Sequence, residues 1–326
     1  MAHPSLCTSG PRIVQLARIR ASALEDLLEE ETYAWRRALE WDFLPTANLV
    51  RRYVELESLA GFALLEGERA VGYTYFVAEE RKGLVGDLYV MQAFRHSGGE
   101  ARLLAAALDA LRANRQVRRI ESQLMLLDDA LDRPLPASEH LRRFERQLMV
   151  TEAAPARRLA PRAGTGVAFQ LWDDRFQGEA AEVIAQAYRG HVDGEVNDQY
   201  RSAAGARRFL HNIIQYPGCG RFLPQASWVA LERLGDRLCG LCLTSMVAGD
   251  VGHITQVCVV PEVRGRGVGY ELLRRSLVSL GEAGARKISL TVTVVNRRAV
   301  ALYEAMGFLP RRRFAALVWE GFRWEE

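Results

Sequence analysis

Lysine is nearly absent from the sequence, which contains only Lys82 and Lys287 and takes almost all of its positive charge from arginine. The 43 lysine and arginine residues exceed the 40 aspartate and glutamate residues by three, so the formal net charge is +3. This excess is small and the arginines are dispersed along the chain, which argues against a nucleic-acid-binding surface. We therefore expect no nucleic-acid partner.

Cysteines and long apolar runs are also scarce. Five cysteines in 326 residues do not predict a disulfide framework and favour a reducing compartment. They are Cys7, Cys219, Cys239, Cys242 and Cys258. No 18-residue apolar stretch is free of charge, and residues 1–20 lack the apolar segment of a signal peptide. The sequence predicts a cytoplasmic protein with no membrane partner.

The two halves of the sequence predict the same order of elements, and a length of 326 residues is typical of two domains. With a shift of 169 residues, Arg95 falls on Arg264 and Gly98 on Gly267 (264 − 95 = 267 − 98 = 169). A repeat of this length indicates two whole domains rather than small repeated units. We predict domains over residues 1–155 and 164–326, with the seam near Ala153–Gly166, a segment that holds Pro155 and Pro161.

Hydrophobic periodicity predicts, in each half, a strand, two helices, a hairpin, a strand, a helix, a strand and a last helix. In the first half the last helix is predicted over Ser138–Leu148, with Ser138 as its cap. In the second half the hairpin is predicted to turn at Leu234–Asp236. The elements that follow are predicted over Ile254–Val260, Gly267–Leu280, Ile288–Val294 and Arg297–Met306.

The strongest functional signal is the run Val-Val-Pro-Glu-Val-Arg-Gly-Arg-Gly-Val-Gly at 259–269, which joins a predicted strand to a predicted helix. Backbone N–H groups at such a turn point at one spot beside the positive end of the helix dipole, which suits a phosphate. A dinucleotide fingerprint would need glycine where Tyr270 stands, and a P-loop would need a lysine that the turn lacks.

This turn resembles the coenzyme A turn of the GNAT superfamily of N-acetyltransferases. Downstream, Asn-Arg-Arg-Ala-Val-Ala-Leu-Tyr-Glu-Ala-Met-Gly-Phe at 296–308 is similar to the second signature of that superfamily. The resemblance implies an α/β fold of two tandem GNAT domains, each a mostly antiparallel, splayed mixed sheet flanked by helices. The tandem arrangement is similar to that of the mycothiol synthase family.

The resemblance also implies acetyl-CoA as co-substrate and no metal. By position, Val257, Cys258 and Val259 would contact pantetheine, and a backbone N–H near Val259 would polarise the thioester carbonyl. The pyrophosphate would be held by Arg264, Gly265, Arg266, Gly267, Val268 and Gly269, with Asn296 as a further coenzyme-site residue. Tyr303 matches the usual general acid, whose phenol protonates the departing thiolate.

The base and the acceptor site are less well defined. Thr291 stands where some family members carry a glutamate base. Others place a histidine on the strand before the glycine turn, where His253 stands here, so the resemblance implies His253 as the base, with a strand-end structural role as the alternative. Asp193, Glu195 and Asp198 lie in the segment that borders the acceptor site in the family, where they would hold a cationic substrate. A solvated polar loop is the other interpretation of that segment.

The first half of the sequence lacks the residues that the resemblance assigns to the acetyl-CoA site. Its turn places Glu100 where Gly269 stands in the repeat, and a carboxylate there would repel pyrophosphate. The chain is therefore expected to be an N-acetyltransferase with one acetyl-CoA site, acting on a small amine, an amino sugar or a peptide amine as a monomer or homodimer. The alternative is a non-catalytic acyl-CoA sensor.

Overall fold

The computed structural model describes residues 10–216, 218, 220–233 and 237–322. Contacts divide the chain into two compact units. Of the described residues, the first unit takes 10–37, 43–143 and 314–322, and the second takes 38–42 and 144–313. This division differs from the linear one expected from the repeat, because each unit includes a strand from the other half of the sequence.

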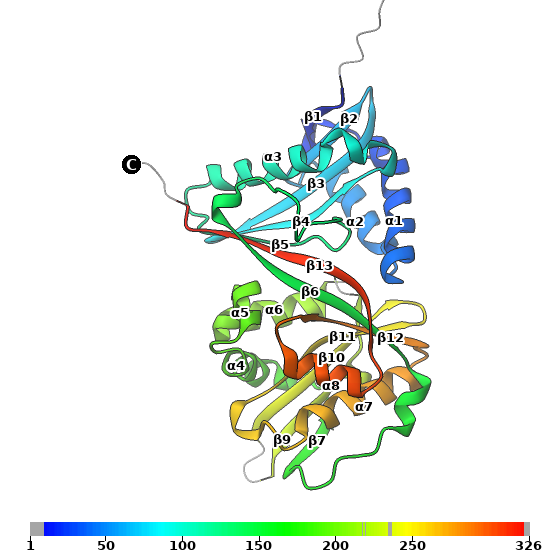
Figure 1. The fold of residues 1–326 in the computed structure, drawn as a ribbon, viewed down its shortest axis with the longest axis vertical. Helices are drawn as coiled ribbons and strands as arrows, with labels where there is room; N and C mark the ends of the chain where they lie inside the picture. The colour runs from blue at the N-terminus through cyan, green and yellow to red at the C-terminus, as the bar shows by residue number, and fades with distance from the viewer. Residues whose placement is uncertain (1–9, 217, 219, 234–236, 323–326) are drawn as a thin grey trace, which may run out of the picture. The chain divides into compact units, whose positions relative to one another are not determined.

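The first unit is a sheet flanked by helices (Figure 1). Its strands follow the order β1 (Arg12–Gln15), β2 (Gly61–Glu66), β3 (Arg69–Glu79), β4 (Lys82–Val90), β5 (Arg119–Gln123) and β13 (Leu309–Glu320). Neighbours are antiparallel except β4 and β5. Helix α3 (Gly99–Ala113) packs on β2, β3 and β4, and α1 (Glu25–Leu39) and α2 (Leu44–Glu55) complete the helices of this part of the chain.

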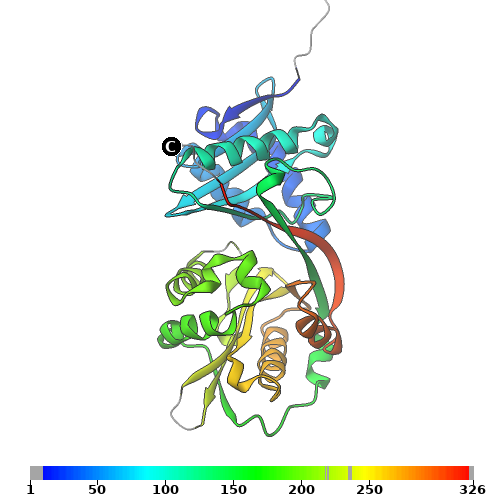
Figure 2. The same cartoon turned by 60° about the vertical axis from the view of Figure 1, so that its left-hand side comes forward.

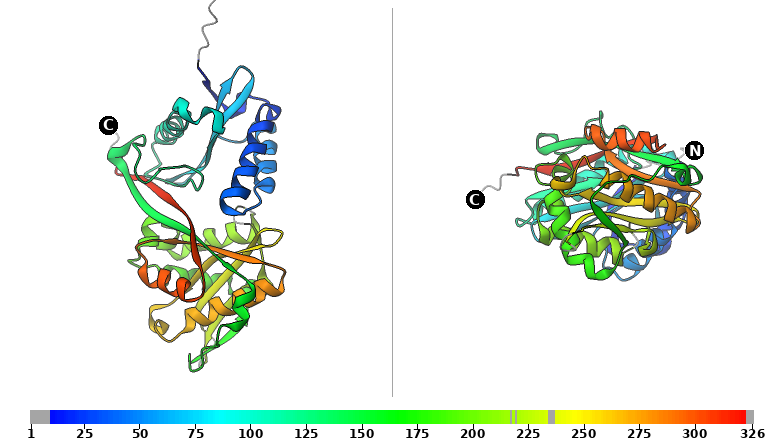
Figure 3. Two further views of the ribbon diagram at one scale, coloured as in Figure 1. Left: turned by 45° about the vertical axis from the view of Figure 1, so that its right-hand side comes forward. Right: turned by 90° about the horizontal axis from the view of Figure 1, so that it is seen from below.

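The second unit repeats this plan (Figure 2). Its strands follow the order β6 (Leu141–Glu152), β12 (Lys287–Thr293), β11 (Val251–Val259), β10 (Leu238–Ala248), β9 (Trp228–Glu232) and β7 (Val167–Leu171), with β8 (Arg221–Phe222) beside β10. Its helices are α4 (Gln177–Ala187), α5 (Val192–Val196), α6 (Ala203–Gln215), α7 (Val268–Glu282) and α8 (Arg297–Ala305). Figure 3 shows this unit from another side, with β6 alongside β12.

Strands β11 and β12 are parallel and pair only from Val251 and Lys287 to Ile254 and Leu290. Beyond these residues the two strands no longer pair with each other, although β11 continues to Val259 and β12 to Thr293. The backbone groups that face the widening gap are therefore available to another hydrogen-bonding group. The splayed sheet expected from the family resemblance is present at this point.

The repeat is confirmed by a shared irregularity in the two sheets. In the first unit, the pairing of β3 with β4 skips Gly86, between Val85 and Asp87. In the second, the pairing of β10 with β11 skips Thr255, between Ile254 and Gln256. The two skipped residues are 255 − 86 = 169 positions apart, which is the shift that aligns the two halves. Each bulge bends its strand where the parallel pair separates.

The helix predicted over Ser138–Leu148 is wrong, because this segment enters strand β6 at Leu141. Leu141, Phe144 and Leu148 have helical spacing, yet the backbone of Arg146 to Glu152 pairs with β12 in a strand ladder.

Strand β13 was not predicted. Its core residues, Ala315 to Trp319, are fully buried and follow an arginine run that resembles an exposed tail. The predicted turn Leu234–Asp236, with Cys7 and Cys219, lies outside the described residues.

Candidate active site

The glycine-rich turn connects β11 to α7, and its shape depends on backbone conformations that favour glycine. Gly265 and Gly267 have φ angles of +77° and +79°, which favour glycine. A Cβ added at Gly265 would meet no atom within 4 Å, and one added at Gly269 would meet only Val259, at 4.0 Å. Packing therefore does not require glycine at either position. The space over the first turn of α7, where the helix dipole is positive, fits a pyrophosphate.

Arg264 has a structural role in this turn. Its Nη2 donates a hydrogen bond of 2.6 Å to the carbonyl oxygen of Ala187, at the end of α4. This contact fixes the direction in which the chain leaves β11. Arg266 is exposed beside it, and Val268 is buried as the first residue of α7. Because Arg264 is engaged with Ala187, the backbone amides of the turn remain its candidate anion-binding groups.

The last residues of β11 alternate in burial where the strand has left β12. Val257 and Val259 are partly exposed, and Cys258 between them is buried. Burial raises the pKa of the Cys258 thiol to about 12, so this side chain stays a neutral thiol. The strand thus offers backbone amides and apolar side chains to an extended ligand in the gap.

Tyr303 lies on α8 and is 7% exposed. The side chain of Asn296 caps this helix by accepting a hydrogen bond of 3.3 Å from the backbone N–H of Ala299. Burial, and then the charge of Asp193, raise the pKa of the Tyr303 phenol above its ordinary value. The phenol therefore keeps its proton at neutral pH and can donate it.

Asp193 is brought to the end of β12. Its carboxylate accepts a hydrogen bond from the hydroxyl of Thr293, the last residue of that strand. His191 caps α5 by accepting from the backbone N–H of Asp193 at 3.1 Å, which positions the carboxylate. The charge of Asp193 is also one cause of the raised pKa of Tyr303, after burial.

The other predicted acceptor residues lie nearby with partners of their own. Glu195 forms an ion pair of 3.1 Å with Arg201, and both side chains are 43% exposed. Asp198 begins a short 3-10 turn that runs to Arg201. Tyr188, which the sequence analysis missed, accepts a hydrogen bond of 3.1 Å from Gln256 on β11 and stacks on Tyr200. It is partly buried at the end of α4, and its bond to Gln256 connects this end of the helix to β11.

His253 is 4% exposed, and its Nδ1 lies 2.9 Å from the hydroxyl of Ser289. The ring contacts Trp41 edge to face, with centroids 4.8 Å apart. Burial, and then the charge of Arg146, lower the pKa of His253 to about 3. An imidazole with this pKa is a weak proton acceptor, so the geometry gives no support to the prediction that His253 is the base.

Arg146 is a site residue that the sequence analysis missed. It lies on β6 opposite Thr293 in the register, and its Nη2 donates a hydrogen bond of 3.0 Å to Thr291. Its charge contributes to the lowered pKa of His253 and partly opposes the rise in the pKa of Tyr303. The sequence analysis predicted a helix for this segment and therefore did not place Arg146 at the site. Arg146 reaches β12 only because the segment forms strand β6.

Cys239 and Cys242 are free, buried thiols, and burial raises their pKa values to about 11 and about 12.

Within the described ranges, no three His, Cys, Asp or Glu side chains gather as a metal site would require. None of the helices in the same part of the chain is long and apolar enough to cross a membrane.

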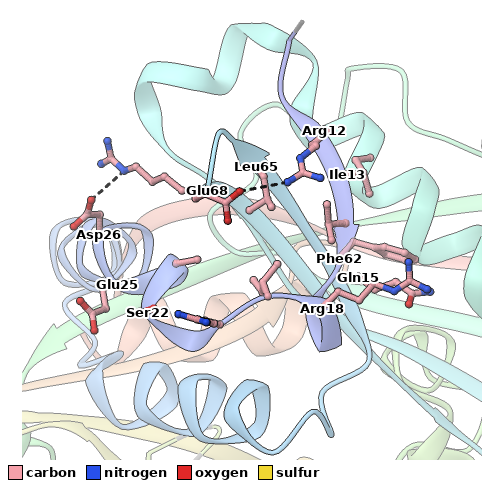
Figure 4. A pocket seen from close by; sticks show the side chains of 15 residues that line it. Arg12, Ile13, Gln15, Arg18, Ser22, Glu25, Asp26, Phe62, Leu65 and Glu68 are labelled. Carbon is pink, nitrogen blue, oxygen red and sulfur yellow. Dashed lines mark ion pairs between the residues drawn. The ribbon is translucent and has the colours of Figure 1, made fainter.

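A cavity of about 1280 Å³ lies in the first unit between β1, β2 and the turns before α1 (Figure 4). Its polar lining includes Arg12, Glu68, Asp26 and Arg69, which form two ion pairs with each other. It contains none of the predicted site residues. We therefore assign the candidate active site to the turn, the gap and α8 of the second unit rather than to this cavity.

Comparisons with known proteins agree with that location. Residues 196–308 match the family model described as "Acetyltransferase (GNAT) family". The chain is 36% identical over 157 residues to N-alpha-acetyltransferase MAK3 of Arabidopsis thaliana, covering 43% of this chain and 74% of that protein. It is 28% identical over 257 residues to a mycothiol acetyltransferase of Thermobispora bispora, covering 76% and 80% of the two chains.

Among solved structures, the chain is similar to a tandem GNAT protein from the clavulanic acid biosynthesis pathway. The TM-score is 0.65 at 17% identity, and the match covers 97% of this chain and 100% of the other. At this identity the likeness concerns the fold, which it extends to both units of the present chain.

Proposed function

The chain belongs to the GNAT family of acetyltransferases, and from that premise we propose that it transfers an acetyl group from acetyl-CoA directly to a primary amine. It is a tandem-domain acyltransferase of that family. The observation that carries the proposal is the turn over α7, where positive-φ glycines and open space leave room for a pyrophosphate.

Acetyl-CoA, when bound, supplies a thioester carbonyl that an amine can attack. The backbone of Arg264 to Gly269 would hold its pyrophosphate, and Val257, Cys258 and Val259 would contact its pantetheine arm. A backbone N–H near Val259 would donate a hydrogen bond to the carbonyl oxygen as negative charge develops there. Tyr303 would give its proton to the departing sulfur.

Asp193 would orient the amine. Its carboxylate is fixed by Thr293 and lies in the region of the Tyr303 phenol. An ammonium group would be attracted to it and must lose a proton before attack. Because burial leaves His253 a weak base, we propose that this proton passes to water or that the amine arrives deprotonated.

The first unit is proposed not to hold acetyl-CoA. Glu100, in the first turn of α3, is buried and forms an ion pair of 2.6 Å with Arg133. Asp87, which matches Gln256 in the repeat, stands where β4 leaves β5, and its pKa is raised by burial to about 6. A carboxyl group therefore stands at the position that matches Gly269, and a second one lies beside the positions that match Val257 to Val259.

Substitution Tyr303→Phe tests the role of the phenol. It removes the proton donor and leaves the ring, so kcat should fall roughly 10²- to 10⁴-fold. The Kd of acetyl-CoA, measured by calorimetry, should stay within about 2-fold, because the coenzyme is held by the turn and β11. Thiol release from acetyl-CoA with a panel of amines measures the rate.

Two results would contradict the proposal in different ways. Full activity of the Tyr303→Phe variant would remove the assignment of the general acid. Failure of the wild-type chain to bind acetyl-CoA in calorimetry would remove the coenzyme site itself.

A further inference from the structure

We propose that the acceptor amine carries an oxyanion, a carboxylate or a phosphate, and that Arg146 binds this group. The inference rests on the proposed function and deepens it by naming the substrate class. It starts from an arginine whose charge is not matched by the protein.

Arg146 is partly buried in the second unit, and among the described residues no carboxylate pairs with it. Its Nη2 donates to the hydroxyl of Thr291, which is neutral. Its Nε is buried and has no hydrogen-bond partner. Among the described residues, no ion pair is recorded for this guanidinium, whereas its neighbour Glu145 pairs with Arg313. The guanidinium is partly buried, and burial of its unpartnered Nε carries a cost that an incoming anion would offset.

Guanidinium also has the right shape for this task. Its N–H groups form a planar fork that matches the two oxygens of a carboxylate or a phosphate. The bond to Thr291 fixes the orientation of the fork and leaves Nε unused. The arrangement is therefore suited to a ligand oxyanion rather than to a further neutral contact.

The position of Arg146 points to the acceptor rather than to the coenzyme turn. Thr291 binds Arg146 and Thr293 binds Asp193, and these threonines are two residues apart on one face of β12. Two residues along a strand span roughly 7 Å. One face thus offers a cation beside an anion at the spacing of a small molecule that bears both an amine and an oxyanion.

The charges around Tyr303 agree with this placement. Asp193 raises the pKa of its phenol and Arg146 lowers it, so both groups act on the same hydroxyl. An acceptor held between them would have its amine beside the group that protonates the leaving thiolate. Arg146 is then a specificity-determining residue that the first half of the sequence contributes through β6.

The test uses two matched pairs of amines with acetyl-CoA. β-Alanine is compared with propylamine, and 2-aminoethyl phosphate with ethanolamine. In the wild-type chain, kcat/KM should be higher for one or both anionic members, and which of them is preferred separates carboxylate from phosphate. In Arg146→Gln the preference should fall roughly 10- to 100-fold while the uncharged amines are unaffected. Arg146→Lys should restore part of it.

Arg313→Gln is the matched control, because Arg313 lies in the same unit with its side chain 69% exposed. Binding gives a second readout: in the presence of CoA, the preferred anionic amine should raise the melting temperature of the wild type but not of Arg146→Gln. If the anionic amines bind in this way and no thiol is released, the proposed function fails and the anion site stands.

Three results would overturn the inference. The wild-type chain could treat charged and uncharged amines alike in both readouts. Arg146→Gln could weaken acetyl-CoA binding as strongly as it weakens turnover, which would assign the guanidinium to the coenzyme. Arg146→Gln could also melt several degrees lower without ligand and show no rescue by Arg146→Lys, which would make the residue structural.

Discussion

Tyr303 and His253 are both buried in the second unit, and burial affects their chemistry in opposite ways. Loss of water disfavours the charged form of each side chain. The phenol of Tyr303 therefore keeps its proton, which a general acid requires, and its pKa is raised. The imidazole of His253 loses its proton more readily, and its pKa falls to about 3. Burial therefore keeps Tyr303 in the protonated form that donation requires while making its phenol a weaker acid, and it makes His253 a weaker base.

The His253→Gln substitution tests the effect of this burial on stability. In the unfolded chain, histidine binds a proton below a pKa of about 6.5, whereas folded His253 does not until about 3. Its contribution is therefore present above pH 6.5 and is lost as the pH falls toward 3. The wild type should lose about 2 kcal/mol of unfolding free energy between pH 6.5 and pH 5 from this residue. Denaturant titration measures it.

In the Gln variant that component should be absent, and a glutamine can still hydrogen-bond Ser289. The exposed His211 offers a matched control, because His211→Gln should leave the pH dependence unchanged. Parallel stability curves for the wild type and His253→Gln over this range would show that His253 titrates normally and would reopen its assignment as the base.

Helix α7 shows at the scale of an element how a glycine can serve a ligand rather than the fold. Gly267, the N-cap of the helix, has a positive φ that an L side chain rarely adopts. Gly269 has an ordinary helical position, where glycine destabilises a helix relative to alanine. The sheet below it leaves room for a methyl group. Glycine at position 269 destabilises the helix, and this is explained if a ligand must approach the backbone there.

Substitution Gly269→Ala should therefore separate stability from binding. The free energy of unfolding of the variant should rise by roughly 0.5–1 kcal/mol, as expected when alanine replaces glycine in a helix. Its affinity for acetyl-CoA should fall by about 10-fold, equivalent to about 1.4 kcal/mol, because the methyl group occupies the approach of the pyrophosphate. Thermal melting and calorimetry give the two quantities.

Gly281→Ala, near the other end of α7, is the control. A Cβ there would make an ordinary contact of 3.6 Å with Ala153, so stability should respond similarly and affinity should not change. Equal acetyl-CoA affinity in the wild type and Gly269→Ala would place the pyrophosphate elsewhere.

Each unit, at the scale of the whole molecule, is completed by a strand from the other half of the sequence. In the first unit, β13 covers the edge of β5 through pairs from Ala316 to Glu320. In the second, β6 covers the edge of β12 through pairs from Arg146 to Glu152. An uncovered sheet edge exposes unpaired backbone groups and invites aggregation. Neither half of the sequence therefore contains a complete unit.

Dividing the chain into fragments 1–163 and 164–326 tests this arrangement. The first fragment lacks β13 and the second lacks β6, so each alone should fail to give a cooperative thermal transition. Produced together, the fragments should copurify and recover acetyl-CoA binding. Cooperative melting of fragment 164–326 alone, with the affinity of the whole chain, would support the linear division at 155–164 instead.

Local chemistry determined what the sequence could predict by itself. The sequence predicted the glycine turn, the cap at Asn296 and the family from residues close together in the chain, because turns and caps depend on neighbouring backbone conformations. It predicted the repeat by comparing short segments 169 positions apart. The splay followed from the family resemblance, and the shared bulges at Gly86 and Thr255 confirm the repeat in three dimensions.

Only the tertiary structure decided the rest. Leu141–Glu152 has apolar spacing that suits a helix, and pairing with β12 makes it a strand. That pairing carries Arg146 to Thr291, and burial lowers the pKa of His253. Strand pairing, desolvation and unmatched charge depend on residues more than a hundred positions away, and so no local pattern contains them.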